Sequence, residues 1–138
     1  MQLRFWFGAV VLAAQAFLLT GCGTSGGLKA AESAARTPEQ KVMVRAQARW
    51  DALIARNLDL AYTFISPAGR STMPVDVYRG RVNPQYWRKV TVTDAKCEAD
   101  VCDVNLNIEF TVLEMPLSNV VSEKWILADG EWYFIYRG

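Results

Sequence analysis

Residues 102–112 read CDVNLNIEFTV, and this stretch decides the fold. Apolar side chains occupy every second position from Cys102 to Val112, and polar side chains occupy the positions between them. Successive side chains of a β-strand point to opposite faces, so this alternation predicts a strand with one buried and one solvent-exposed face. The chain is therefore expected to contain an antiparallel sheet, because such sheets commonly bury one face only.

The segment before this strand predicts its first partner. Arg88 to Lys96 has strand character, with Val90 and Val92 expected to point inward, and Glu98 to Val101 can form the connecting turn. Cys97 and Cys102 bracket that turn, so as the closing pair of the hairpin they lie within reach of a disulfide bond. Two buried free thiols are the alternative, and a redox-active pair is less favoured because CxxC spacing is missing.

The segments after it predict a second hairpin. Glu123 to Ala128 and Glu131 to Tyr136 flank Asp129-Gly130, which is the strongest short hairpin signal in the chain. Leu113 to Val121 contains Pro116, and we expect an irregular crossing or a bulged strand extension there. A meander of about four strands results.

The segments before residue 87 predict helices instead. Thr37-Pro38-Glu39-Gln40 combines an N-cap, a proline at the first helical position and an acid in the first turn, so a helix is expected from here to about Arg56. Its apolar stripe has spacings of three and four and consists of Val42, Ala46, Trp50, Leu53 and Ile54.

Two shorter helices should follow the first. Leu58 to Ile65 is expected after Asn57, and Ser66-Pro67-Ala68-Gly69 should end it. Val75 to Gly80 is expected after the cap-then-proline signal Thr72-Met73-Pro74, and residues 81–86 should form a loop. Three helices followed by an antiparallel sheet define the class α+β, with residues 37–138 as one domain.

The helical and terminal segments resemble the NTF2-like (cystatin-like) superfamily. The resemblance is carried by Ala48 to Ile54, Asn57-Leu58-Asp59, Ala61-Tyr62, Ser66-Pro67, Arg70, and the terminal Lys124-Trp125 and Trp132 to Ile135. It implies a long first helix in the hollow of a curved sheet, forming a cone whose mouth can hold a ligand. Candidate cone-lining residues are Trp50, Tyr62, Tyr78, Trp132 and Phe134. The alternative is that these aromatic rings belong to the hydrophobic core.

The superfamily includes isomerases and cyclases as well as proteins without catalytic activity, so fold does not decide function. Asp51, Asp59, Tyr62 and Tyr78 have suitable chemistry for an isomerase, but none falls at a matched position. No catalytic residue is assigned.

Residues 1–21 have the features of a secretion signal, with basic Arg4 and an apolar stretch from Phe5 to Leu19. This stretch is shorter than the roughly 18 residues that a membrane-spanning helix needs. Leu19-Thr20-Gly21-Cys22 resembles the lipobox of bacterial lipoproteins. The resemblance implies cleavage before Cys22, a diacylglycerol group on its thiol, and an acyl chain such as palmitate on its amine. Ordinary cleavage beside an incidental cysteine is the alternative.

Residues 22–36 are rich in glycine, serine and alanine, and they are expected to form a flexible tether. Residue 23 is glycine. In the proteobacterial lipoproteins that this chain resembles, aspartate at that position retains the protein in the inner membrane. The expected location is therefore the outer membrane of a two-membrane bacterium, facing the periplasm.

The amino-acid composition limits the partners and the kinds of site that can be expected. The chain has 15 basic and 14 acidic residues and no histidine. Removing Arg4 with the signal leaves a formally neutral protein, which disfavours nucleic acid as a partner. The lack of histidine removes the usual base and the commonest metal ligand, and no metal motif is present, so no metal and no cofactor beyond the lipid on Cys22 are expected.

Two functions remain open. The first is a lipid-anchored, non-catalytic module that binds a protein partner or another component of the cell envelope. The second is a small-molecule-binding protein or enzyme that uses the cone. Arg70, Arg79, Arg81 and Arg88 are candidates for an anionic ligand or a lipid headgroup, with a solvated rim as the alternative.

Overall fold

The computed structural model describes residues 36–137. Cys22, the predicted signal segment and nearly all of the predicted tether lie outside the described residues. The elements in chain order are α2 (Pro38–Ile54), α3 (Leu58–Thr63), α4 (Pro67–Thr72), α5 (Val75–Arg81), the 3₁₀ turn η1 (Pro84–Tyr86), β1 (Trp87–Glu98), β2 (Val101–Val112), β3 (Met115–Ala128) and β4 (Glu131–Phe134). The α+β class is confirmed.

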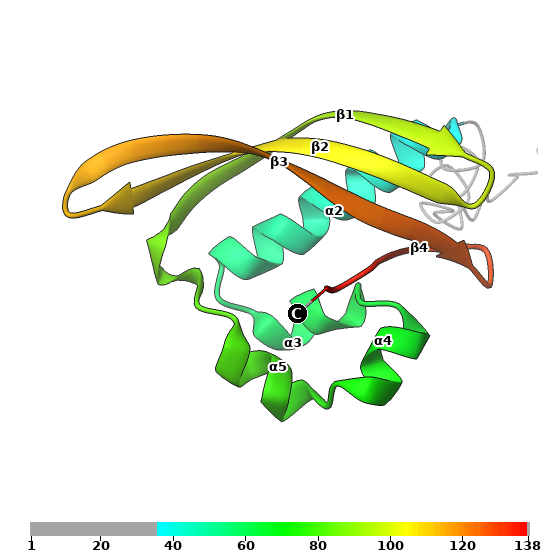
Figure 1. The fold of residues 1–138 in the computed structure, drawn as a ribbon, viewed down its shortest axis with the longest axis horizontal. Helices are drawn as coiled ribbons and strands as arrows, with labels where there is room; N and C mark the ends of the chain where they lie inside the picture. The colour runs from blue at the N-terminus through cyan, green and yellow to red at the C-terminus, as the bar shows by residue number, and fades with distance from the viewer. Residues whose placement is uncertain (1–35, 138) are drawn as a thin grey trace, which may run out of the picture.

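Helix α2 begins where the sequence predicts. The Thr37 side chain accepts a hydrogen bond from the Gln40 amide, and the Gln40 side chain accepts one from the Thr37 amide, which completes a capping box. Its predicted stripe is buried at Val42, Ala46, Trp50 and Leu53. Helix α2 lies along the inner face of the bent sheet (Figure 1).

The second segment of helix is shorter than predicted, and a further helix follows it. Ser66 does not simply end α3, because its hydroxyl accepts a hydrogen bond from the Gly69 amide and caps α4. Pro67 then occupies the first turn, where its missing N–H costs nothing. The expected count of three helices was therefore wrong, and four α-helices precede the sheet in the described part of the chain.

The predicted helix at residues 75–80 is present as α5, but its cap differs from the prediction. Pro74 holds the N-cap position, without a side-chain hydrogen bond, and Thr72 ends the preceding helix. The segment predicted as a loop contains η1, capped by Asn83.

The four strands form an antiparallel meander in the order β1-β2-β3-β4. Alternation along β2 is as predicted, with Cys102, Val104, Leu106 and Ile108 buried. Cys97 lies directly opposite Cys102, and the expected disulfide joins them. Asp129 and Gly130 both have positive φ, 51° and 79°, as the predicted hairpin turn requires.

The prediction for residues 113–121 was wrong, because β3 is a continuous strand from Met115. Leu113 and Glu114 adopt φ of 48° and 66°, which makes them a tight two-residue turn between β2 and β3. Pro116 pairs with Thr111 one step beyond the closing pair. At that step the backbone groups point away from β2, so the missing N–H of proline breaks no bond between the strands.

The core lies between α2 and the concave face of the sheet. Two clusters of buried residues fill it, one around Trp50, Tyr78 and Leu106 and one around Val42, Trp125 and Trp132. Helices α3, α4 and α5 close the side of α2 that faces away from the sheet (Figure 1). The hairpin of β2 and β3 extends past this cover, and its tip stands away from the body.

Candidate functional site

A buried ion pair lies between α2 and β3. The Arg49 guanidinium donates a hydrogen bond to Oε1 of Glu123 at 2.8 Å, and both side chains are only 6% exposed. Trp50 donates to the same oxygen at 3.0 Å, and Trp125 donates to Oε2 at 3.1 Å. Each carboxylate oxygen is thus already hydrogen-bonded within the protein, as a buried charge requires.

The side chain of Tyr78 lies beside this ion pair. Its side chain is fully buried, and neither its hydroxyl nor Nε of Arg49 has a hydrogen-bond partner among the described residues. Burial raises the pKa of Tyr78 above the ordinary value of 10.0, and the nearby positive charge of Arg49 offsets part of that rise. A neutral phenol therefore stands next to the buried ion pair.

The five candidate cone-lining residues lie in or against the core clusters. Four of them contact other rings through the pairs Trp50–Trp87, Tyr62–Tyr78, Tyr78–Tyr136, Trp125–Phe134 and Phe134–Tyr136, with centroids 4.9–6.2 Å apart. Trp132 is 4% exposed and belongs to the second cluster. These rings thus fill the core, and four of the five pack directly on other aromatic rings.

One hollow has a residue of the buried pair, Glu123, among its lining residues. It has a volume of about 220 Å³ and lies between β3 and the segment after β4. Glu123, Phe134 and Arg137 are among its lining residues. This is small compared with the roughly 300–1,000 Å³ of sites that enclose drug-sized ligands.

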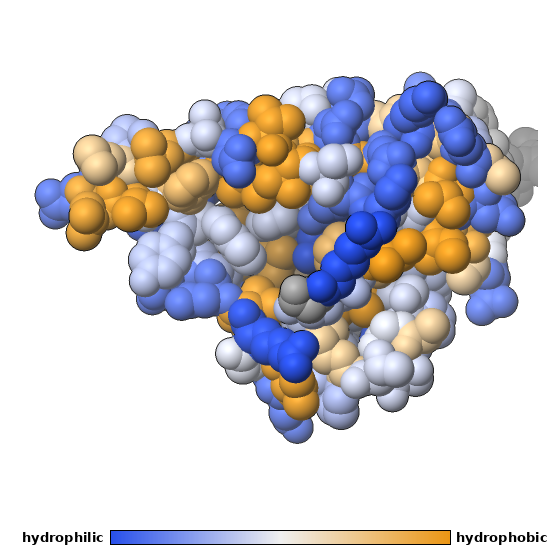
Figure 2. Space-filling model, in the orientation of Figure 1, coloured by the Kyte–Doolittle hydropathy of each residue, from blue (hydrophilic) through white to orange (hydrophobic). Residues whose placement is uncertain are grey.

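The tip of the β2–β3 hairpin carries exposed apolar side chains. Leu113 is 87% exposed at the turn, and Val120 is 71% exposed further along β3. Val112, Met115 and Leu117 complete this group, which we call the hairpin patch. Figure 2 shows hydrophobic surface gathered at this projecting end of the molecule. Val112, Met115 and Leu117 share one face of the hairpin and Val120 lies on the other, so these apolar side chains flank the hairpin on both faces. Exposed apolar side chains grouped in this way commonly mark an interaction site.

The free edge of β3 runs beside the hairpin patch. Pairing with β4 begins only at Trp125 and Phe134, so no described strand covers β3 between Pro116 and Ser122. Residues of an antiparallel strand alternate in the direction of their backbone groups, starting from the hydrogen-bonded closing pair Val112 and Met115. The amides and carbonyls of Ser118, Val120 and Ser122 therefore point outward, away from β2.

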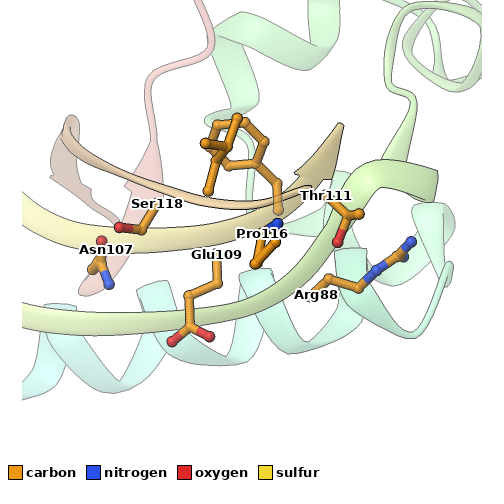
Figure 3. Close-up of a pocket in the computed structure, with 8 residues that line it drawn as sticks. Arg88, Asn107, Glu109, Thr111, Pro116 and Ser118 are labelled. Carbon is orange, nitrogen blue, oxygen red and sulfur yellow. The ribbon is translucent and has the colours of Figure 1, made fainter. Parts of the chain in front are cut away.

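A shallow pocket of about 350 Å³ lies close to the tip of this hairpin (Figure 3). Arg88 comes to it from β1, Glu109 and Thr111 from β2, and Pro116 and Ser118 from β3. It mixes polar and apolar groups next to the open edge, so it extends the same surface.

Three of the four arginines singled out in the sequence have separate partners within the protein, and Arg81 ends the same helix that carries Arg79. Arg79 bridges Asp59 and Asp76, and thereby ties α3 to α5. Arg70 donates to the carbonyl oxygen of Thr63 and lies over the ring of Tyr133. Arg88 donates to the carbonyl oxygen of Gln85. These side chains have local structural partners.

Sequence reasoning missed the Arg49–Glu123 pair, although a signal for it exists. Arg49 follows Val42 by seven positions and precedes Leu53 by four, which puts it on the buried stripe of α2. Glu123 precedes Trp125 by two positions and shares its face of β3. Two opposite charges at inward positions of two elements indicate a buried pair.

Residues 36–137 contain neither a membrane-spanning helix nor a cluster of metal-ligand residues. No helix in this part of the chain is long and apolar enough to cross a membrane. No group of three or more potential ligands of a metal ion comes together there.

Comparison with known proteins bears on the fold. No protein-family model and no curated protein matches the chain. A solved structure with a similar fold is that of a SEC-C motif-containing protein from Rhodopseudomonas palustris, determined in solution. It superposes with a TM-score of 0.52 at 19% sequence identity, covering 64% of this chain and 70% of that protein. At this identity the similarity concerns the α+β fold alone.

Proposed function

We propose that this chain is a lipid-anchored module of the bacterial cell envelope, located on the periplasmic side of the outer membrane, that binds a protein partner and has no catalytic activity of its own. The anchoring half of the proposal is supported by the lipobox-like Leu19-Thr20-Gly21-Cys22. A thioether-linked diacylglycerol together with an N-acyl chain would anchor Cys22 durably, where one chain binds only marginally.

The observation that carries the binding half is the position of the hairpin patch. Helix α2 is 17 residues long, or about 25 Å, and the tether would join the domain just before its start. Trp50, near the other end of α2, packs on Trp87, whose strand partner Phe110 lies two residues from the tip of β2. An anchored domain would thus present the patch at the end remote from its tether (Figure 1).

The chemistry of this surface favours a partner with an extended segment. Such a segment gains main-chain hydrogen bonds by adding to a free strand edge, and apolar neighbours increase the affinity. The outward groups of Ser118, Val120 and Ser122 supply the hydrogen bonds, and Leu117 and Val120 supply apolar contact. No charged residue occurs from Met115 to Ser122, so this edge lacks the charges that commonly protect edge strands.

The test replaces Ser118 by proline in the full-length lipoprotein and captures the partner by a photo-crosslinking residue at Val120. Proline at position 118 removes an outward N–H and leaves the bonds to β2 in place, as Pro116 already does. We expect Ser118→Pro to abolish a discrete crosslinked protein that the matched control Ser118→Ala retains. Equal crosslinking in both variants, or none in either, would contradict partner binding at this edge.

A second function is favoured by one observation. Glu123 is one of the residues that line a hollow, and its ion-pair partner Arg49 and the neighbouring Tyr78 each have a buried polar atom without a hydrogen-bond partner among the described residues. We therefore keep the NTF2-like cone, with a small-molecule ligand, as the alternative proposal. Native mass spectrometry of protein purified from envelopes tests it. A stoichiometric ligand that is lost in Glu123→Gln would favour this alternative over the partner-binding module.

A further inference from the structure

Two edges of the sheet are covered by other parts of the chain. At β1 the cover is the side chain of Gln47 on α2, whose Nε2 donates to the Val90 carbonyl oxygen at 3.0 Å and whose Oε1 accepts from the Val92 amide at 3.1 Å. At β4 the Phe134 amide donates to the carbonyl oxygen of Phe64 at 2.7 Å. The backbone groups of both edges therefore have hydrogen-bond partners within the protein.

The edge of β3 is different over residues 116–122, where no described strand pairs with it. The Ile135 amide donates to the Lys124 carbonyl oxygen at 2.9 Å on this side of β3. Since backbone groups alternate in direction along a strand, this bond shows independently that the even-numbered residues, Ser118 and Val120 among them, direct theirs outward. Beyond β4 the chain runs toward α3 and leaves this edge open (Figure 1).

The composition of the open edge suits pairing with an identical edge. Residues 115–122 read MPLSNVVS and contain no charged side chain. Edge strands commonly carry charges, lysine above all, because a row of like charges repels another copy of the same edge. The open edge of β3 lacks this protection, and a second copy presents the same outward amides and carbonyls in the opposite direction.

Charges next to this stretch favour one register. In an antiparallel pair with a two-fold axis at Asn119, Ser118 of one copy lies opposite Val120 of the other, and Glu114 of each copy lies opposite Lys124 of the other. Glu114 is exposed, and Lys124 is 39% exposed beside its ion pair with β2. An axis at Ser118 or Val120 would not bring these two charges together.

We propose that the partner bound at this edge is a second copy of the chain, paired antiparallel through residues 116–122 about a two-fold axis at Asn119. The inference rests on the proposed function, whose partner it names. The pairing forms about six hydrogen bonds between the copies, because Pro116 lacks an amide hydrogen at each end. On the concave face, Leu117 of each copy lies opposite Val121 of the other.

The paired segment is about 23 Å long, so the interface is small. Two copies that are anchored in one membrane have a high effective concentration, which favours a pairing that would be weak in dilute solution. The two copies together form one continuous antiparallel sheet with twice the four strands of a single chain.

The test introduces one cysteine at Asn119 in the full-length chain, expressed in its host and oxidised mildly in the envelope. Two cysteines at the axis occupy a non-hydrogen-bonded pair, with Cα atoms about 4.5 Å apart, which is within disulfide range. Two cysteines at Val120 are diagonal neighbours about 7–8 Å apart. We expect Asn119→Cys to form a disulfide-linked dimer at least about tenfold faster than Val120→Cys.

Two controls accompany these variants. Thr91→Cys places the cysteine at an exposed position of β1, whose edge Gln47 covers, and it should remain monomeric. The wild-type chain is oxidised in parallel, so that dimers formed through its own cysteines are recognised. A lack of dimer with Asn119→Cys, or equal dimer formation by Val120→Cys or Thr91→Cys, overturns the proposal.

A second substitution tests the main-chain hydrogen bonds. Ser118→Pro in the Asn119→Cys chain removes an outward amide and should reduce the dimer about tenfold, whereas Ser118→Ala should leave it unchanged. Circular dichroism of each purified variant shows whether it has folded. Equal dimer formation by the two folded variants would mean that strand pairing does not join the copies.

The result separates this inference from the proposed function. Co-expression of two differently tagged copies identifies a dimer of the chain with itself. If the photo-crosslinking residue at Val120 captures a different protein while Asn119→Cys stays monomeric, the second copy is not the partner and the partner-binding module stands. If neither captures a protein, both proposals are wrong.

Discussion

Arg49 on α2 and Glu123 on β3 form an ion pair 2.8 Å long in the interior, although 74 residues separate them in the sequence. The pair joins the long helix to the middle of the sheet at one defined position. Trp50 and Trp125 add hydrogen bonds from each side of that contact. A helix that slid along the sheet would leave two buried charges without partners, so the pair opposes such a shift.

Replacing Arg49 by methionine is expected to lower the free energy of unfolding by about 3–5 kcal/mol, because Glu123 is left buried and uncompensated. The double variant Arg49→Met with Glu123→Leu should recover much of this loss, since both charges are gone. Urea denaturation of the two single variants and the double variant gives the coupling energy. Strictly additive effects would show that the two side chains stabilise the fold independently.

The disulfide offers a second measurable contribution. Cys97 and Cys102 close a short loop with a sequence separation of five, for which chain entropy predicts about 2 kcal/mol of stabilisation. We expect the double variant Cys97→Ala and Cys102→Ala to fold with its urea midpoint lowered accordingly. Adding a reductant should destabilise the wild-type chain and leave the double variant unaffected. A reductant effect of equal size in the double variant would point to another cause.

The parts of the fold that the sequence predicts are those with a local cause. Alternation from Cys102 to Val112 needs only the geometry of one strand, and the Asp129-Gly130 turn needs only two residues that accept positive φ. The capping box at Thr37 spans four residues. The expected disulfide follows from the position of the two cysteines on either side of one hairpin turn. The turn itself is tighter than predicted, because Glu98 and Val101 form its closing pair and Cys97 and Cys102 are the next pair.

The features that the sequence did not predict depend on contacts between residues that are far apart in the chain. Ser66 was interpreted as a helix stop, but the same side chain starts a further helix, and its amide donates to the Phe134 carbonyl oxygen on β4. The β2–β3 turn uses Leu113 and Glu114, which are poor residues for positive φ, so no turn signal marked it. The open edge of β3 likewise exists only after the sheet has formed.

The unfavourable backbone conformation of the β2–β3 turn suggests a stabilising substitution. Glu114 has φ of 66°, a conformation that costs a residue with a side chain about 1–2 kcal/mol and glycine almost nothing. After the entropy of glycine in the unfolded chain is included, Glu114→Gly should raise the unfolding free energy by about 0.5–1 kcal/mol. Thermal denaturation measures it, with Glu114→Ala as the control that removes the charge and keeps the strain. Equal stabilisation by both would assign the effect to charge.

The alkaline stability of the protein should depend on Tyr78. Burial raises its pKa in the folded state above the ordinary 10.0, so the folded state resists losing this proton. Its contribution to stability is complete below about pH 10 and is lost as the pH rises from there through the folded-state pKa. Tyr78→Phe removes a buried hydroxyl that has no hydrogen-bond partner among the described residues, so stability at pH 7 should stay equal or increase slightly. Urea denaturation between pH 7 and about 11 should then show a smaller decline than in wild type, while Tyr86→Phe, at a half-exposed ring, should leave the wild-type decline unchanged. The same decline in all three proteins would mean that Tyr78 ionises as readily in the folded state as in the unfolded chain.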